Sequence, residues 1–373
     1  MPFSAALSPS PAGTLVVYLP RHDTPPHETG VHRALTERLA ALAGQIFDGD
    51  HDAARHGGRP VYVVPAFTIE SAAEAERPGI RDEGDLFGGV VPQAFVGSKL
   101  ITHGLVRPDA AAPPHWQPDF AMQVRPSVLA GYSTFSREDA RTAGRELLRA
   151  GPVRLKPACG RGGRGQTVVR DGAALDAALA AIGDDDFRDE GLVVEEDLAD
   201  AETFSVGQIR TPRLTLSYHG TQRLTPDNDG RLVYGGSDLT VVRGGFDALI
   251  ASGALAPELR TAVDQARRYD AAAGACFAGF YASRRNYDVV AGTDAQGRRR
   301  SGVLEQSWRI GGASGAEVAA LAAFVEGGAT GVVRASCVER FGRGGAPPPA
   351  GATLLYQGDD PEVGFVTKYA YLR

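Results

Sequence analysis

The chain has 373 residues, 43% hydrophobic and 23% charged, with a formal net charge of −6. This length predicts two or three globular domains, and the acidic balance argues against a nucleic-acid partner, which requires a basic face. Cys159, Cys276 and Cys337 are too few and too widely spaced for a disulfide framework or a zinc site. No leader sequence or membrane-length apolar run is present, so we expect a cytoplasmic protein without a membrane partner.

The first part of the chain predicts a parallel β-α-β unit. Residues 14–19 and 60–64 are short apolar runs of strand type, and residues 31–42 repeat apolar side chains at helical spacing. Such a unit favours a parallel sheet covered by helices, so we expect a Rossmann-like domain over residues 1–95. The loop at residues 22–28 suits contact with a ligand or simple capping of the helix.

The most distinctive stretch is a glycine-rich loop between two segments of strand type. Residues 153–157 alternate apolar and basic side chains, including Lys156, and residues 166–169 resume an extended pattern. Glycine lets backbone N–H groups approach an anion, and arginine raises the local positive potential. An anionic ligand is the simplest reason for this composition, although a surface hairpin without a ligand has the same pattern. The loop contains Gly160, Arg161, Gly162, Gly163, Arg164 and Gly165.

The spacing of Gly160, Gly162 and Gly165 also matches the glycine motifs of dinucleotide-binding domains and protein kinases. The dinucleotide motif requires a helix to begin within the glycines, whereas residues 166–169 are of strand type. The kinase motif requires its lysine on the strand after the loop, whereas Lys156 precedes the loop. Neither class therefore fits.

Acidic residues follow another buried strand. The apolar residues 191–194 lead directly into Glu195 and Glu196, with Leu198 and Glu202 shortly after. Carboxylates accept hydrogen bonds from ribose hydroxyls, and free backbone groups can pair with the edge of an adenine base. This arrangement suits the base and sugar of a nucleotide, although each acid taken alone is more often a surface charge.

A predicted hairpin, with strands at residues 287–290 and 302–309, carries further acids, including Asp288. Because side chains alternate across a strand, the second strand divides into two rows. One row holds Val303, Glu305, Ser307 and Arg309, and the other holds Leu304 and Trp308.

A carboxylate on each of two neighbouring strands, with an arginine beside them, can hold Mg²⁺ between nucleotide phosphates. Asp288, Glu305 and Ser307 are therefore candidate metal ligands, although an ordinary hairpin with surface charges is the alternative. Two capping boxes are also predicted, each at the start of a helix: Ser136 with Asp139 before this hairpin, and Ser314 with Glu317 beyond it.

In this order the features resemble the ATP-grasp superfamily. The strand with Lys156, the glycine loop and the returning strand resemble its ATP-covering hairpin, and Lys99 resembles its first ATP-contacting lysine. Glu195 resembles the acid that begins the hinge, Leu198 the residue whose backbone contacts adenine, and Glu202 the acid that binds ribose.

Asp288 followed by Glu305, Ser307 and Arg309 resembles the superfamily signature of Asp and then Glu-x-Asn-x-Arg. Ser307 stands where Asn is usual and is a poorer metal ligand. The whole chain also looks like an uncharacterised bacterial family within the superfamily.

The resemblance implies an α/β fold of the α+β ATP-grasp type, with a Rossmann-like domain followed by a two-subdomain module. We expect a pre-ATP-grasp domain at 1–95, a linker and first ATP-grasp segment at 96–130, a lid subdomain at 131–205 and a metal-binding C-terminal subdomain at 206–373. The resemblance also implies ATP and Mg²⁺ as cofactors. Lys99, Lys156 and the loop amides would contact the phosphates, Asp288 and Glu305 the metal, and Arg309 the transferring group.

The implied activity is an ATP-dependent ligase that converts a substrate carboxylate to an acyl phosphate for attack by an amine or thiol, forming a C–N or C–S bond. Small-molecule acids and amines would be the partners, with a homodimer possible. A nucleotide-binding regulatory protein with lost or weak turnover is one alternative, motivated by Ser307. A carboxylase resembling biotin carboxylase is another.

Overall fold

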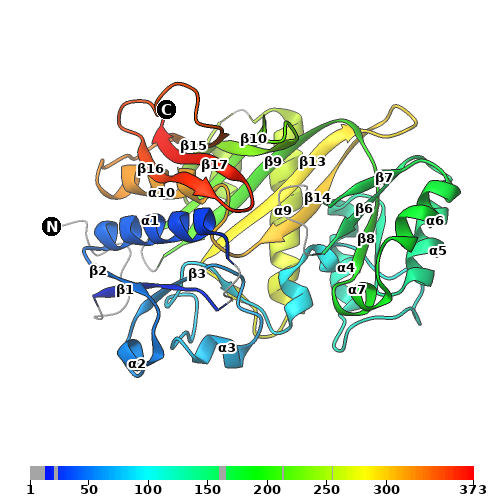
Figure 1. Cartoon of the computed structure of the whole chain (residues 1–373), viewed down its shortest axis with the longest axis horizontal. Helices are drawn as coiled ribbons and strands as arrows, with labels where there is room; N and C mark the ends of the chain where they lie inside the picture. The colour runs from blue at the N-terminus through cyan, green and yellow to red at the C-terminus, as the bar shows by residue number, and fades with distance from the viewer. Residues whose placement is uncertain (1–12, 21–23, 159–164, 212–213, 254) are drawn as a thin grey trace.

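The computed structural model describes residues 13–20, 24–158, 165–211, 214–253 and 255–373. These residues form sheets of three, eight, two and four strands. In Figure 1 the three-stranded sheet lies below the large sheet. The four-stranded sheet and its helices lie at the right of the molecule. No helix in the described part of the chain is long and apolar enough to span a membrane.

The N-terminal sheet is parallel, in the order β2-β1-β3. Its elements are β1 (Thr14–Tyr18), α1 (Pro26–Ala43), β2 (Ile46–Asp50), α2 (Ala53–His56), β3 (Tyr62–Pro65) and α3 (Ala72–Glu76). The expected strands and helix are present, but the sequence did not reveal β2. This edge strand contains Asp48 and Asp50 and has no buried residue, so it lacks the apolar run of a central strand.

The four-stranded sheet, here called the lid sheet, has the order β5-β8-β6-β7. Its elements are β5 (Gly131–Thr134), α5 (Arg137–Leu147), β6 (Val153–Pro157), β7 (Thr167–Val169), α6 (Gly172–Ala180), α7 (Asp184–Asp189) and β8 (Leu192–Glu196). Strands β6 and β7 form the antiparallel hairpin that the sequence predicted. Ser136 accepts a hydrogen bond from the Asp139 amide and caps α5, also as predicted.

The eight-stranded sheet is antiparallel, in the order β14-β13-β9-β10-β11-β15-β17-β16. Its strands are β9 (Ala199–Arg210), β10 (Thr215–Pro226), β11 (Leu232–Arg243), β13 (Arg284–Thr293), β14 (Arg299–Ser307), β15 (Val333–Phe341), β16 (Thr353–Asp360) and β17 (Gly364–Leu372). The small sheet pairs β4 (Gly89–Val90) with β12 (Tyr281–Ala282).

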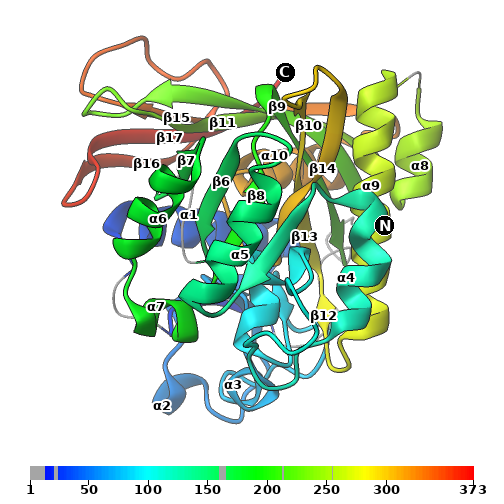
Figure 2. The same ribbon diagram turned by 90° about the vertical axis from the view of Figure 1, so that its right-hand side faces the viewer.

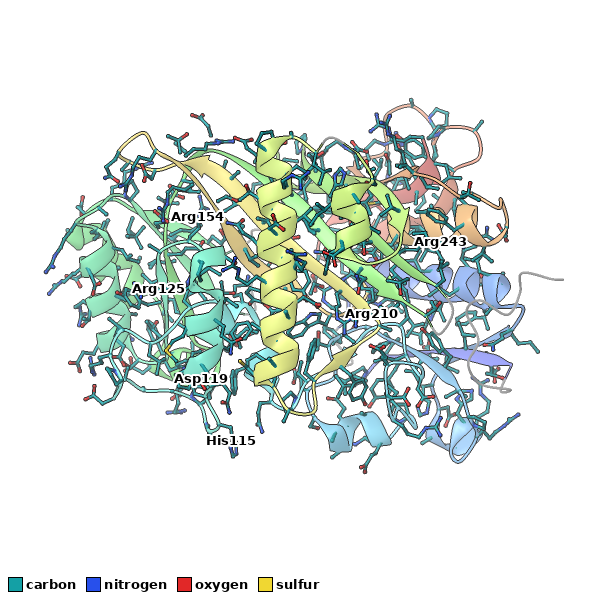
Figure 3. The ribbon with its side chains drawn as sticks, turned by 180° about the vertical axis from the view of Figure 1, so that it is seen from behind. His115, Asp119, Arg125, Arg154, Arg210 and Arg243 are labelled. Carbon is teal, nitrogen blue, oxygen red and sulfur yellow. The ribbon has the colours of Figure 1, made fainter. Side chains whose placement is uncertain are left out.

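Helices cover both faces of the large sheet. On the back, α9 (Pro257–Cys276) packs against β9, β13 and β14, beside α8 (Phe246–Ala251). Figure 3 shows α9 crossing the strands from behind, with Arg210 near the sheet and Arg154 on the lid sheet beyond it. On the front, α10 (Ser314–Val325) packs against β11, β15 and β17.

The segment between the N-terminal sheet and the lid sheet, which includes the predicted linker, forms short helices. It forms three 3₁₀ helices and one α-helix: η2 (Ala94–Gly97), η3 (Lys99–Thr102), α4 (Pro118–Val124) and η4 (Arg125–Ser127). Phe120 and Val124 of α4 are buried in the core beside α9. The view in Figure 2 shows α4 running beside α9.

A β-bulge in β14 overturns the expected division of its side chains. The register shifts so that Leu304 and Glu305 both oppose Asp288. Val303 is buried together with Trp308 in the core on the α9 side, whereas Leu304 packs on the opposite side. The prediction that Val303 shares a row with Glu305 is therefore wrong, because the extra residue reverses the alternation.

The N-terminal helix packs on the C-terminal strands. Leu35 and Leu39 of α1 share one core with Leu355 of β16 and Ala370 of β17. The backbone N–H of His27 donates to Asp360 Oδ2 at 3.1 Å. The two ends of the described chain therefore stabilise each other.

Candidate active site

The 3₁₀ helix η3 and the residue after it connect the large sheet to the lid sheet. Lys99 Nζ lies 2.9 Å from Glu305 Oε2 on β14. His103 Nε2 lies 2.8 Å from Glu195 Oε2 on β8. Residues predicted from distant stretches are therefore brought together around one short segment.

On the lid side, Glu195 binds two partners. Its Oε1 lies 2.8 Å from Lys156 Nζ, and all three side chains, including that of His103, are at most 4% exposed. Burial by itself raises the pKa of Glu195, but Lys156 and His103 together lower this pKa to about 2. Glu195 is therefore ionised at neutral pH. Nothing in the sequence distinguished His103 from the other histidines.

On the large sheet, Asp288 and Glu305 lie directly opposite each other on β13 and β14. Burial and the negative charge of Glu305 raise the pKa of Asp288 to about 6. Asp288 Oδ1 accepts hydrogen bonds from Gln222 Nε2 and Asn286 Nδ2, each at 2.9 Å. Neither amide was identified from the sequence.

These two carboxylates fit a hard divalent cation. They oppose each other, both partly buried, and a cation between them would relieve their repulsion. The described residues contain no group of three or more His, Cys, Asp or Glu that could hold a metal ion. Further ligands would have to come from neutral oxygens, water or the phosphates of a nucleotide.

Ser307, the third predicted metal ligand, accepts a hydrogen bond from Arg284 Nη1 at 3.2 Å. Arg284 also binds Glu317 through two bonds of 2.6 and 3.0 Å, and both residues are almost fully buried. Burial alone would lower the pKa of Arg284, but Glu317 raises it above its ordinary value, so the guanidinium stays charged. The predicted capping box at Ser314 is wrong, because Glu317 binds Arg284 and α10 has no side-chain cap.

The predicted hinge residues have different environments. Glu196 contacts the Ala130 amide at 3.0 Å and Arg300 at 3.2 Å. Leu198 is 8% exposed, whereas Glu202 is exposed. Leu198 belongs to a small apolar cluster between the lid sheet and the large sheet, which suits contact with a flat base. The other members, which the sequence did not reveal, are Leu129, Val290 and Leu304.

The glycine loop lies largely outside the described residues, which omit Gly160, Gly162 and Gly163. Gly165 is described and has φ +74°, a left-handed conformation that favours glycine. Arg309, the predicted contact for the transferring group, lies just beyond β14, and its Nη1 donates to Ile310 O at 2.6 Å.

A surface cavity of about 450 Å³ lies elsewhere, at the end of β2. Its lining includes Arg33, Asp50, His51 and Arg55, none of which belongs to the predicted site. Its charged groups largely satisfy one another, as in the ion pair of Arg33 with Asp50. Charged side chains of the large sheet and the lid sheet meet around η3, and this favours the region around η3 as the candidate site.

The arrangement of a parallel N-terminal sheet, a lid sheet and a large antiparallel sheet is the ATP-grasp fold, which confirms the fold predicted from the sequence. Residues 15–370 match the family model described as "Protein of unknown function (DUF3182)", and the chain belongs to this family. No curated protein matches the chain.

Several solved structures share the fold at low sequence identity. Carboxyaminoimidazole ribonucleotide synthase from Aspergillus clavatus, complexed with ATP, is 13% identical, with 97% of this chain and 94% of that chain covered and a TM-score of 0.53. N5-carboxyaminoimidazole synthetase from Staphylococcus aureus is 10% identical, with 100% and 96% covered and a TM-score of 0.55. Biotin carboxylase from Campylobacter jejuni is 12% identical, with 97% and 87% covered and a TM-score of 0.51. At these identities the likeness shows the fold alone.

Proposed function

We propose that the chain is an ATP- and Mg²⁺-dependent ligase whose nucleotide binds between the lid sheet and the large sheet. The observation that carries this proposal is that residues 99–103 join two Lys–Glu pairs: Lys99 pairs with the partly exposed Glu305, and His103 contacts Glu195, which is buried and paired with Lys156. Solved structures of the same fold contain ATP in one case and ADP in another, which supports a nucleotide as the ligand.

The proposed roles follow from charge and position. Lys99 and Lys156 present ammonium groups to the phosphates, and Glu195 orients Lys156 through their contact. Leu198 and its apolar neighbours contact the base. Asp288 and Glu305 hold Mg²⁺, which when bound neutralises charge on the phosphates. Arg309 binds the group being transferred.

The reaction class we propose is activation of a carboxylate. A carboxylate oxygen of a small-molecule acid attacks the γ-phosphorus of ATP, the bond to ADP breaks, and an acyl phosphate forms. An amine or thiol then attacks the acyl carbon, phosphate leaves, and the nucleophile gives up its proton. Catalysis consists of positioning and charge neutralisation, so no protein nucleophile is required.

Glu305→Ala tests the proposal, with Glu339→Ala as a matched control. Glu339 forms a comparable pair with Lys368, at 3.0 Å, elsewhere in the large sheet. ADP release with a mixed pool of acids and amines should fall at least about 100-fold in Glu305→Ala and stay within about twofold in Glu339→Ala. Undiminished turnover in a folded Glu305→Ala protein would remove the metal role.

A second candidate is a nucleotide-binding regulatory protein without turnover. The engagement of Ser307 by Arg284 favours it, because the hydroxyl already has a hydrogen-bond partner. Tight ADP binding without ADP release from any acid and amine pool would support this reading. ADP release that requires bicarbonate, with or without biotin, would instead indicate a carboxylase.

A further inference from the structure

Asn286 lies in the middle of the candidate metal site. It is on β13, directly opposite Ser307 and two residues before Asp288, so all three side chains share one face of the sheet. Its side chain is largely buried, and its Nδ2 lies 2.9 Å from Asp288 Oδ1. An uncharged amide oxygen is a common ligand for hard cations.

The hydrogen bonds around Tyr218 favour a second orientation of the Asn286 amide. Tyr218 Oη lies 2.5 Å from Glu317 Oε1, 3.0 Å from Asn286 Oδ1 and 3.5 Å from the Arg285 carbonyl oxygen. A phenol has one proton, and the short contact with a charged carboxylate takes it. In this orientation Tyr218 has no proton left for Asn286 Oδ1. Tyr218 can accept a hydrogen bond from Asn286 only if the amide turns, with Nδ2 towards Tyr218 and Oδ1 towards Asp288.

Turning the amide places two oxygen atoms about 3 Å apart, which is unfavourable unless a cation lies between them. The same separation is expected for two neighbouring oxygen ligands of an octahedral Mg²⁺, since ligands about 2.1 Å from the ion at 90° are about 3 Å apart. Gln222 still donates to Asp288 Oδ1 at 2.9 Å and keeps this carboxylate in place.

We propose that Asn286 is a cation ligand, with its Oδ1 beside the carboxylates of Asp288 and Glu305. The inference deepens the proposed function and rests on it. Without the cation, Nδ2 donates to Asp288; with it, the amide turns, Oδ1 binds the ion, and Nδ2 donates to Tyr218. Tyr218 is fixed by Glu317, which is itself fixed by Arg284, so the ligand is held from the core of the sheet.

Mn²⁺ binding in the presence of ADP tests the assignment by electron paramagnetic resonance of the free ion. Asn286→Leu should weaken Mn²⁺ binding about 10- to 100-fold, while ADP binding in EDTA stays within about twofold. Asn286→Asp keeps the shape and supplies an oxygen but no N–H donor, so it should bind Mn²⁺ at least as tightly as the native chain. Asn228→Leu, at the other asparagine of the chain, is the control and should change neither constant.

The outcomes separate the possible roles. An equal loss of Mn²⁺ affinity in Asn286→Leu and Asn286→Asp would show that Asn286 only donates to Asp288, which overturns the assignment. A Mn²⁺ affinity of Asn286→Leu within twofold of the native value would also overturn it. A native chain that binds neither ADP nor Mn²⁺ overturns the proposed function and the inference with it. Circular dichroism and the melting temperature show whether each variant is folded, and the isosteric Asn286→Asp protects the test if Asn286→Leu does not fold.

Discussion

Lys156 and Glu195 form a buried ion pair across β6 and β8 of the lid sheet, with Nζ 2.8 Å from Oε1. His103, from the segment after η3, binds the second carboxylate oxygen. The charge that we propose to act on a nucleotide is therefore also part of the packing between the lid sheet and the rest of the chain.

Removing Lys156 should destabilise the protein strongly. Lys156→Met leaves a buried carboxylate with His103 as its one remaining side-chain partner among the described residues, and we expect a loss of about 3–5 kcal/mol. Arg154→Met is the control, because its pair with Asp197 is partly exposed and should be worth less than about 1 kcal/mol. Urea unfolding measures both, and equal losses would contradict the prediction.

Glu195 should make the fold acid-sensitive. Its pKa is about 2 in the folded protein and 4.5 in the reference state, so its ionised form stabilises the fold above pH 4.5. The contribution, about 3 kcal/mol, disappears as the pH falls from 4.5 towards 2. The difference in unfolding free energy between the native chain and Glu195→Gln should therefore shift by about that amount over this range. A difference independent of pH would be the contrary result.

Lys99 should compete with a metal ion for Glu305. In Lys99→Met, Glu305 loses its ion-pair partner while it still faces Asp288, so the variant should melt earlier than the native chain in EDTA. Adding Mg²⁺ should then raise its melting temperature more than that of the native chain. Lys368→Met, which removes the partner of Glu339, should show no such difference. Equal responses to Mg²⁺ in all three proteins would contradict the metal site.

The bulge in β14 predicts different effects for neighbouring substitutions. Val303→Ala removes buried contacts on the α9 side and should cost about 1–3 kcal/mol of stability with unchanged ADP affinity. Leu304→Ala should cost less stability but raise the Kd for ADP about fivefold, because Leu304 packs in the apolar cluster with Leu198. Calorimetry in EDTA measures the affinity for ADP, and urea unfolding measures the stability. If Val303→Ala weakened ADP binding and Leu304→Ala did not, the base would bind elsewhere.

Features that depend on residues close together in the sequence were predictable. Alternating residues around Lys156 gave the β6–β7 hairpin, Ser136 gave the cap of α5, and the acids at Asp288 and Glu305 occur on paired strands. The ATP-grasp resemblance gave the fold class and the order of these features. Each of these predictions depends on a short stretch of sequence or on the spacing of residues in a motif.

Features that depend on tertiary contact were not predictable. His103 and Gln222 gain their roles only because η3 and β10 approach β8 and β13. Glu317 has capping spacing from Ser314, but a buried guanidinium competes for it more strongly. The bulge has no sequence signature here, because Leu304 and Val303 are both apolar and only the partner strand decides which of them is the extra residue.

The contact between α1 and β16 has a consequence for biosynthesis. Residues 26–43 leave the ribosome early, yet this helix packs against β16 and shares a core with Leu355. The helix therefore cannot complete its burial until almost the whole chain has been translated. During that interval Leu35 and Leu39 lack the part of their core that β16 supplies.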